Sequence, residues 1–485
     1  MSTSKNLLKQ TAIYGLATVF PRVFSFVLVP LYTHVLPKEE YGEMSLVFSW
    51  MVLFNVVLAY GMETSFFRFF NKESEPNAVF NTAILSILGT SLLFLGVALL
   101  FQNPVAALMR IDATYIVYTI WILVLDALVI VPFSKLRADQ KPMRYAVIKI
   151  ANVAINLGLN VFFLIYLPKL VVAQNFGFLD FIYLPNFQIG YIFVSNLIAS
   201  GITFLILLPH YFQISLKMNW DLWKKMMRYG SPILVAGIAF SVNETFDRIL
   251  LDWLLPPDIA KAQIGAYSAC YKLALFMTLF ATAFRLGIEP FFFSHAKNKN
   301  APQTYSLITQ YFVIFGAIIL IVVVVFADLL KLIMIRDSSY FEAMQIVPLI
   351  IIANLFLGIY HNLSVWYKLT DKTMMGAYIS LAGASVTLLL NYLLIPEIGI
   401  FGSALATVSA YGLMMTLSFF IGKKYYPIPY NTTKIMGYLS VSIMGSLLHF
   451  YFFRENYIVG TLFLLIFSFF VYKNEKSTLQ ALLKR

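Results

Sequence analysis

Long apolar runs follow one another through most of this sequence. A helix of about 20 apolar residues is long enough to cross the hydrocarbon core of a bilayer. Membrane β-strands are shorter and alternate in polarity, whereas these runs are continuously apolar. The sequence therefore predicts fourteen membrane-spanning helices, at residues 8–35, 41–63, 78–101, 113–134, 146–167, 188–209, 227–255, 262–288, 304–326, 340–362, 374–395, 400–421, 434–452 and 457–472.

The charged residues are too few to cover a soluble protein. They make up 12% of the chain, against 60% hydrophobic residues, and a soluble globular protein carries roughly 25% charged residues. Composition thus excludes a soluble multidomain enzyme. It predicts an all-α polytopic membrane protein.

The net charge of +12 is explained by topology. With fourteen spans and a cytoplasmic N-terminus, 24 of the 35 Lys and Arg residues fall in inner loops and tails, 7 in outer loops and 4 within spans. This asymmetry follows the positive-inside rule. It predicts that both termini are cytoplasmic and that no nucleic acid is bound.

A weak internal repeat divides the chain. Two segments run from Tyr-Gly through a long helix to Leu-Pro and enter the next helix at a Gly near a Tyr. A second pair of segments combines Pro, Gly and a run of small residues, which lets helices approach closely in lipid. These pairs are AIYGLATVF…HVLPKEEYGEMSL (12–46) with MRYGSPILV…WLLPPDIAKAQIGAYSA (227–269), and YLPNFQIGYIFVSNLIASG (183–201) with LIPEIGIFGSALATVSAYG (394–412). We therefore predict six-helix lobes at 1–215 and 216–425, and an appended helix pair at 426–485. Such duplication is common in transporters.

The span pattern, the opening segment KNLLKQTAIYGLATVFPRVFSFVLVPLYTHVLPKEEYGEMSL and the turn PEIGIFGSALAT together resemble the polysaccharide flippase branch of the multidrug/oligosaccharidyl-lipid/polysaccharide exporter superfamily. This resemblance implies a V-shaped pair of bundles that alternates between inward-open and outward-open states. It implies a non-enzymatic flippase in a bacterial inner membrane. The implied cargo is a polyprenyl-pyrophosphate-linked oligosaccharide for lipopolysaccharide or surface polysaccharide, and the implied partners include polysaccharide polymerase or ligase machinery.

Span seven contains an unusual set of charges. Glu244, Arg248 and Asp252 share one helical face at spacings of four residues, so Arg248 is expected between two carboxylates. Asn243 and Asp247 form a second pair, offset by one position. Ionisable groups at membrane depth usually face a cavity or one another. Either an internal ion-pair ladder or a functional role explains these residues.

Two cations lie near mid-membrane without an acidic residue close by in their own helices. Arg22 follows the helix-breaking Pro21 in span one, and Lys272 lies in span eight. A guanidinium gives paired, charge-assisted hydrogen bonds to phosphate oxygens. The resemblance implies that cations of the first and eighth helices bind the pyrophosphate, which assigns Arg22 and Lys272 to the head group. Arg248 of span seven is predicted to join them. For Arg22, an ion pair with Asp126 is the alternative.

Three further charged residues each have two possible roles. Asp126 is a lone carboxylate in span four and is either a coupling site for H⁺ or Na⁺ or a counter-ion to Arg22 or Lys272. Arg285 and Glu289, at spacing four near the inner end of span eight, form either a structural pair or a gate.

Other functional classes lack their motifs. No G-x-x-x-x-G-K-[ST] loop for ATP, H-E-x-x-H helix or G-x-S-x-G elbow occurs. Cys270 is the only cysteine and the five His are scattered, so neither a metal site nor a cofactor is expected. Two rivals to the flippase stay open. One is a cation-coupled multidrug exporter of the same fold, and the other is a membrane enzyme that polymerises, ligates or acylates glycans.

Overall fold

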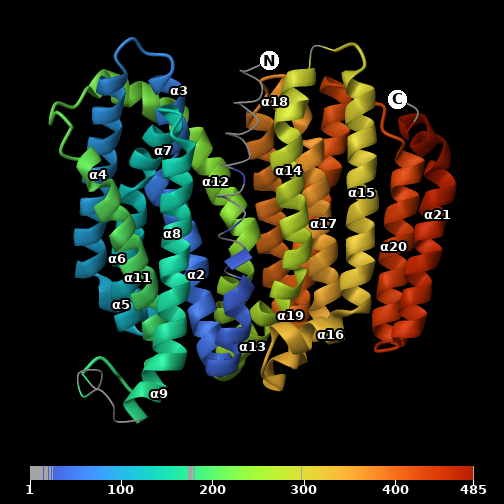
Figure 1. Ribbon diagram of the computed structural model, residues 1–485, viewed down its shortest axis with the longest axis horizontal. Helices are drawn as coiled ribbons and strands as arrows, with labels where there is room; N and C mark the ends of the chain where they lie inside the picture. Colours follow the sequence, from blue (N-terminus) through green and yellow to red (C-terminus); the bar gives the residue numbers. More distant parts are fainter. Residues whose placement is uncertain are drawn as a thin grey trace. The chain divides into compact units, whose positions relative to one another are not determined.

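Helices form the regular structure of this chain. The computed structural model describes residues 26–172, 181–296 and 298–483, together with Gly15, Phe20, Val23, Phe24 and Gly177, and these residues contain no strand (Figure 1). The predicted all-α polytopic fold is confirmed. The chain divides into two compact units, Met1–Gly265 and Ala266–Arg485.

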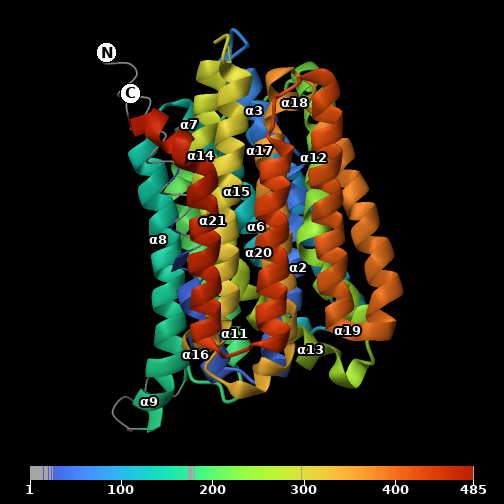
Figure 2. The same cartoon turned by 90° about the vertical axis from the view of Figure 1, so that its right-hand side faces the viewer.

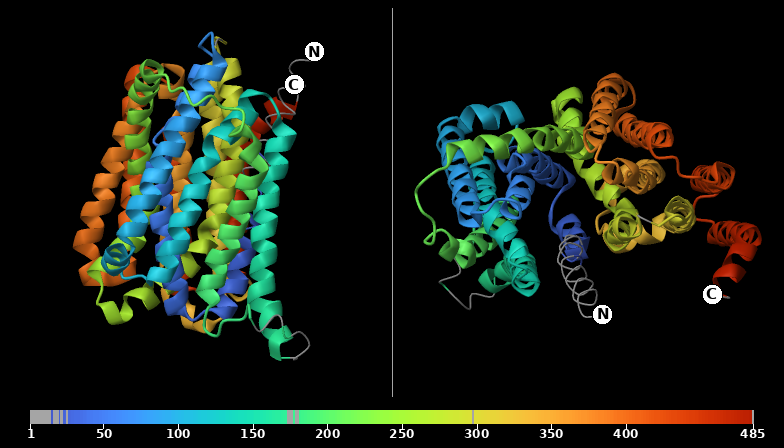
Figure 3. Two further views of the ribbon diagram at one scale, coloured as in Figure 1. Left: turned by 90° about the vertical axis from the view of Figure 1, so that its left-hand side faces the viewer. Right: turned by 90° about the horizontal axis from the view of Figure 1, so that it is seen from above.

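The first unit is built from long helices joined by short connections, and the right-hand view of Figure 3 shows these helices nearly end-on. Its elements are α2 (Lys38–Ala59), α3 (Met62–Phe70), α4 (Pro76–Leu100), α5 (Gln102–Met109), α6 (Ala113–Leu128), α7 (Ile130–Ala138), α8 (Pro142–Val161), the π-helix η1 (Phe162–Tyr166), α9 (Leu167–Val172), α11 (Gln188–Leu207), the 3-10 turn η2 (Leu208–His210), α12 (Trp220–Leu254) and most of α13 (Pro257–Tyr271).

In the second unit, α15, α20 and α21 pack together (Figure 2). Its elements are the 3-10 turn η3 (Lys272–Ala274), α14 (Leu275–His295), α15 (Ala301–Val325), α16 (Ala327–Met334), the 3-10 helix η4 (Ser338–Ile346), α17 (Val347–Leu363), α18 (Val365–Leu369), α19 (Met374–Tyr425), α20 (Thr432–Phe452) and α21 (Tyr457–Leu483).

Eleven helices in the described part of the chain are long and apolar enough to cross a membrane. The helix α19 counts once among them, although the sequence predicts two spans there. The helix α12 has 35 residues but is not among the eleven. Of the first predicted span, the end Phe26–Val35 is an apolar helix. The exact number of fourteen spans stays a prediction.

The helix α19 is broken at the predicted turn between two spans. Ile398 and Gly399 have non-helical backbone angles, and Gly399 has a φ of 56°, which glycine adopts without steric cost. Ser403 donates a hydrogen bond of 2.8 Å to the side chain of Asn391. Twelve residues of straight helix would cover about 18 Å, so the chain folds back at Gly399.

Large apolar side chains are exposed on many helices. Leu93, Leu100 and Ile458 are 69%, 76% and 83% exposed, which a soluble protein would not tolerate over such an area. This surface fits hydrocarbon, and the chain is a multi-pass membrane protein.

The helix α12 stays with the first unit because it packs antiparallel along α2 and α3. Ser65 donates a 3.0 Å hydrogen bond to the carbonyl of Met226. Further along the interface, the ring of Trp50 lies 6.0 Å from that of Trp253. The boundary between the units, at residues 265 and 266, therefore differs from the predicted lobe boundary at 215 and 216. The division into six-helix lobes and an appended pair stays a prediction.

Candidate functional site

Arg22 and the adjacent Pro21 lie outside the described residues. Lys272 opens the 3-10 turn η3, where the helix changes from α13 to α14. The assignment of both cations to a head-group site stays a prediction.

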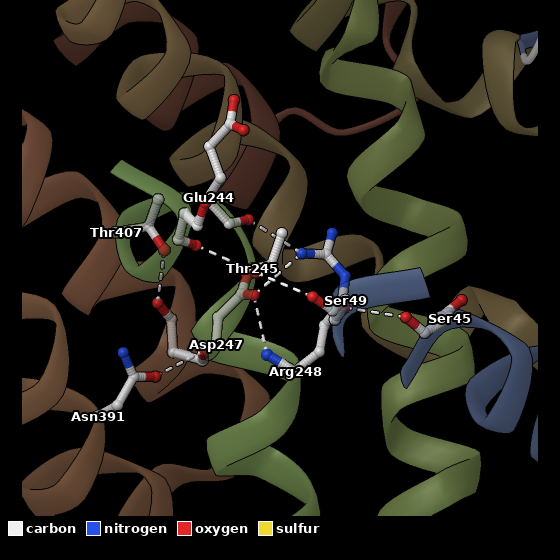
Figure 4. A network of polar contacts seen from close by, with 10 residues as sticks. Ser45, Ser49, Glu244, Thr245, Asp247, Arg248, Asn391 and Thr407 are labelled. Atoms are coloured by element: carbon white, nitrogen blue, oxygen red, sulfur yellow. Dashed lines mark hydrogen bonds and ion pairs between the residues drawn. The ribbon is translucent and has the colours of Figure 1, made fainter. Parts of the chain in front are cut away.

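Arg248 forms an ion pair within α12, and its partner is not the predicted one. Its Nη1 lies 2.9 Å from Oδ1 of Asp247 and donates a 3.3 Å hydrogen bond to the backbone carbonyl of Glu244. Figure 4 shows the Glu244 carboxylate pointing away from the guanidinium. The expected placement of Arg248 between the carboxylates of Glu244 and Asp252 is corrected to a pair with Asp247. Adjacent residues usually diverge on a helix, but the arginine side chain is long enough to turn back.

Small polar side chains line the neighbouring surface of α2. Thr245 of α12 donates a 3.5 Å hydrogen bond to the carbonyl of Ser49, and Ser49 donates one of 2.9 Å to the carbonyl of Ser45 (Figure 4). Asp247 and Arg248 are buried beside this surface, with side chains 4% and 10% exposed. A buried ion pair is costly to break, because either charge left alone is uncompensated. Arg248 therefore has an internal partner, Asp247, and a functional role for these charges stays a prediction.

The far end of α12 carries a second charged network that sequence reasoning missed. Arg110 donates a 2.8 Å hydrogen bond to the carbonyl of Asp252, and Lys261 pairs with Glu43 at 3.0 Å. The Oδ2 atom of Asp252 is buried without a hydrogen-bond partner among the described residues. These contacts join α2, α5, α12 and α13. Their partners lie up to 218 positions apart, so spacing within one helix gives no signal for them.

Two glycines of the internal repeat meet at this end. A Cβ on Gly42 would lie 1.9 Å from the carbonyl oxygen of Lys261, and a Cβ on Gly265 would lie 1.8 Å from that of Lys38. Each glycine thus faces the carbonyl of the residue that lies four positions before the other glycine. The contact is reciprocal, as expected where two copies of a repeat cross about a pseudo-twofold axis. Only glycine permits this approach of α2 and α13.

Asp126 is hydrogen-bonded to a neighbouring helix. It accepts a 2.8 Å hydrogen bond from Ser200 Oγ in α11. Arg22, one of its two predicted counter-ions, lies outside the described residues, so the pairing of Asp126 with Arg22 or Lys272 stays a prediction. Whether Asp126 also binds a coupling ion stays a prediction.

Glu289 pairs across helices rather than within α14. Its Oε1 accepts a 2.6 Å hydrogen bond from Lys368 of α18, so the predicted Arg285–Glu289 pair is corrected to Lys368–Glu289. Arg285 lies beside this pair in the wall of the same small cavity, which is open to solvent. A gating role for these residues stays a prediction.

Polar contacts anchor the last two helices, α20 and α21, to the rest of the second unit. Glu475 of α21 is 1% exposed and accepts hydrogen bonds from Gln310, Lys434 and Tyr438 at 2.7–2.8 Å. At the other end, Arg454 forms two hydrogen bonds of 2.7 and 2.9 Å with Asp328. Among the described residues, no group of three or more His, Cys, Asp or Glu is placed to hold a metal ion.

Two families match the sequence. The family described as "Polysaccharide biosynthesis protein" matches residues 7–286, which is more than half of the chain. The family described as MatE matches residues 232–393. No curated protein matches the chain in sequence.

Solved structures share this fold over most of the chain. The lipid II flippase MurJ, in an inward closed conformation, is similar with a TM-score of 0.73 at 14% identity, covering 96% of this chain and 99% of its own. An inward-facing multidrug resistance transporter of the MATE family gives a TM-score of 0.62 at 10% identity, with coverages of 87% and 96%. An outward-facing one gives 0.57 at 12%, with coverages of 88% and 96%. At such identities the likeness shows the fold alone.

Proposed function

Because this chain belongs to the polysaccharide biosynthesis protein family, we propose that it is a flippase for a lipid-linked oligosaccharide. The cargo is a glycan on a polyprenyl pyrophosphate, which moves from the cytoplasmic to the outer leaflet of a bacterial inner membrane. The translocated glycan is then used in the synthesis of lipopolysaccharide or another surface polysaccharide. The proposed partner in that step is a polysaccharide polymerase or ligase. The family match over residues 7–286 carries this proposal, and the multi-pass helical fold is compatible with it.

In this proposal Arg22 and Lys272 hold the pyrophosphate. A phosphate at membrane depth needs cations close to it, because its charge is costly in a low dielectric. Arg248 is the weaker third member, since a phosphate would have to compete with Asp247 at 2.9 Å. The polyprenyl tail stays in lipid while the lobes 1–215 and 216–425 alternate between inward-open and outward-open states.

The source of energy is a separate question. Asp126, Glu244 and Asp247 are the carboxylates proposed for ion coupling or internal pairing. Asp247 already pairs with Arg248. Asp126 accepts a hydrogen bond from Ser200, and binding of a proton by a carboxylate at membrane depth is a physical route to proton coupling.

A cation-coupled multidrug exporter is the second candidate. The match of residues 232–393 to the MatE family favours it. Such a transporter would use an acidic cavity for organic cations, with Asp126 and Glu244 as its carboxylates. A membrane enzyme of glycan polymerisation, ligation or acylation is the third, and glycan chain growth on purified protein would favour it.

Reconstitution tests these functions. Liposomes that contain the protein and a polyprenyl-pyrophosphate oligosaccharide are assayed for exposure of the glycan to an outside lectin. We expect transfer by the wild-type protein, loss in Arg22→Glu, and retention in Arg22→Lys, which keeps the charge. Normal transfer by Arg22→Glu would remove Arg22 from the site. Absence of protein-dependent transfer with several glycans and an imposed ion gradient would refute the flippase and favour the exporter.

A further inference from the structure

The cavity between α14, α17 and α18 holds more positive charge than its internal pairing uses. Its polar wall consists of Arg285, Glu289, His361, Asn362 and Lys368. Arg285 makes no hydrogen bond or ion pair with any residue that the structure describes. With one carboxylate for Arg285 and Lys368, the wall carries an excess cation even when His361 is neutral.

The existing ion pair leaves Lys368 available. The side chains of Lys368 and Glu289 are 29% and 36% exposed, and solvent-exposed ion pairs contribute little to stability. An incoming anion can therefore share the ammonium of Lys368 at low cost. The guanidinium of Arg285, in the same wall, offers the fork of donors that matches phosphate oxygens.

The rest of the cavity lining is apolar. Ile288, Phe292 and Val365 complete it; Phe292 and Val365 belong to a hydrophobic cluster that includes Tyr305, and Ile288 packs against this cluster. A free inorganic anion gains nothing from such a surface. A ligand with an anionic head and an apolar body gains from both parts of the wall.

The position along the helices fits the membrane boundary. Lys368 directly precedes the end of a candidate span at Leu369. The helix α14, which carries Arg285, continues to His295, and the apolar run predicted there ends at residue 288. Basic pockets between membrane helices near the ends of spans bind lipid head groups.

We propose that this cavity binds the phosphate of a lipid at the membrane boundary, with Arg285 and Lys368 as its ligands and Ile288 and Phe292 against the first part of the tail. The phosphate comes from a polyprenyl pyrophosphate or from an anionic phospholipid of the bilayer. The site requires only binding, so it does not depend on the proposed transport.

Native mass spectrometry of the purified full-length protein tests the site with two probes. Farnesyl pyrophosphate is compared with farnesol, and phosphatidylglycerol is compared with phosphatidylcholine. We expect the double variant Arg285→Ala/Lys368→Ala to bind one phosphate-bearing molecule fewer than the wild type, or to bind it about tenfold more weakly, as expected for the loss of charge-assisted hydrogen bonds. Lys299→Ala is the matched control because Lys299 is exposed in the loop after α14, outside the cavity.

The outcomes separate the two sources. If the double variant loses binding of farnesyl pyrophosphate alone, the ligand is the polyprenyl lipid. If it loses binding of phosphatidylglycerol alone, the ligand is a bilayer lipid. Equal binding of both probes by the wild type and the double variant would overturn the proposal. The charge-conserving variant Arg285→Lys/Lys368→Arg guards against misfolding, since it should melt normally and retain the ligand. Lipid binding by this cavity without any glycan transfer in liposomes would leave the site standing and refute the flippase.

Discussion

At the scale of single residues, the charges inside the helices are largely matched by contacts that a helical wheel does not show. Arg248 was expected beside carboxylates at spacing four and instead pairs with its neighbour Asp247. Glu289 was expected to pair with Arg285 and instead contacts Lys368, 79 positions away. Spacing predicts which residues share a face of one helix. It cannot predict which helix lies opposite, or how a long side chain turns.

The Asp247–Arg248 pair leads to a stability prediction. Asp247→Asn leaves a buried guanidinium without its counter-ion, and we expect a loss of about 3 kcal/mol. The double variant Asp247→Asn/Arg248→Met removes both charges and should regain most of that loss. Thermal melting of the detergent-purified proteins measures both effects. If the single and double variants melt alike, the pair does not contribute as the geometry indicates.

The Asp328–Arg454 contact predicts a dependence on pH. Burial alone would raise the pKa of Asp328, but hydrogen bonds from Arg454 and Lys331 outweigh it and lower this pKa below its ordinary value. A carboxylate with a lowered folded-state pKa contributes stability above its unfolded-state pKa, and this contribution disappears as pH falls through the folded-state value.

Melting curves between neutral and acidic pH test this. The wild-type protein should lose stability on acidification more steeply than Asp328→Asn, which has no charge to lose. Parallel curves for the two proteins would show that Asp328 does not contribute.

At the scale of helices, glycine positions set how closely α2 and α13 approach. Gly42→Ala and Gly265→Ala each place a methyl group within 2 Å of a backbone carbonyl oxygen. The oxygen belongs to the main chain and cannot rotate away, so the helices must separate. We expect each variant to lose about 1–3 kcal/mol, the usual cost of overpacking.

Gly89→Ala is the control for this prediction. A Cβ on Gly89 of α4 would meet nothing within 4 Å, and alanine favours a helix over glycine by roughly 1 kcal/mol. Melting of the three variants should therefore show losses at Gly42 and Gly265 and none at Gly89. Equal behaviour of all three would mean that the contact between α2 and α13 is looser than described.

Much of this helical framework could be predicted. The apolar runs predicted most of the long helices from residue 38 onward, and the turn PEIG predicted the break in α19 at Gly399. The repeat also singled out Gly42 and Gly265, but not that they touch. That contact depends on the crossing of two helices 223 positions apart, which a pattern within one sequence does not contain.

At the scale of the whole molecule, the fourteen-span topology can be tested with single cysteines. Cys270 is fully buried and donates to the carbonyl of Tyr340 at 3.4 Å, so it should not react with a membrane-impermeant maleimide. Cysteines at Lys299 and Asp337 fall in predicted inner and outer loops. We expect labelling of Asp337→Cys in intact cells, and of Lys299→Cys only after permeabilisation. The opposite pattern would invert the topology.

The contact between Trp50 of α2 and Trp253 of α12 gives the protein an intrinsic optical reporter. Two indole rings 6.0 Å apart are close enough for their excited states to couple, which produces a paired near-ultraviolet circular dichroism signal. The chain has only six tryptophans, so Trp50→Phe can assign this signal. Any ligand or condition that separates α2 from α12 should then be visible without attaching a dye.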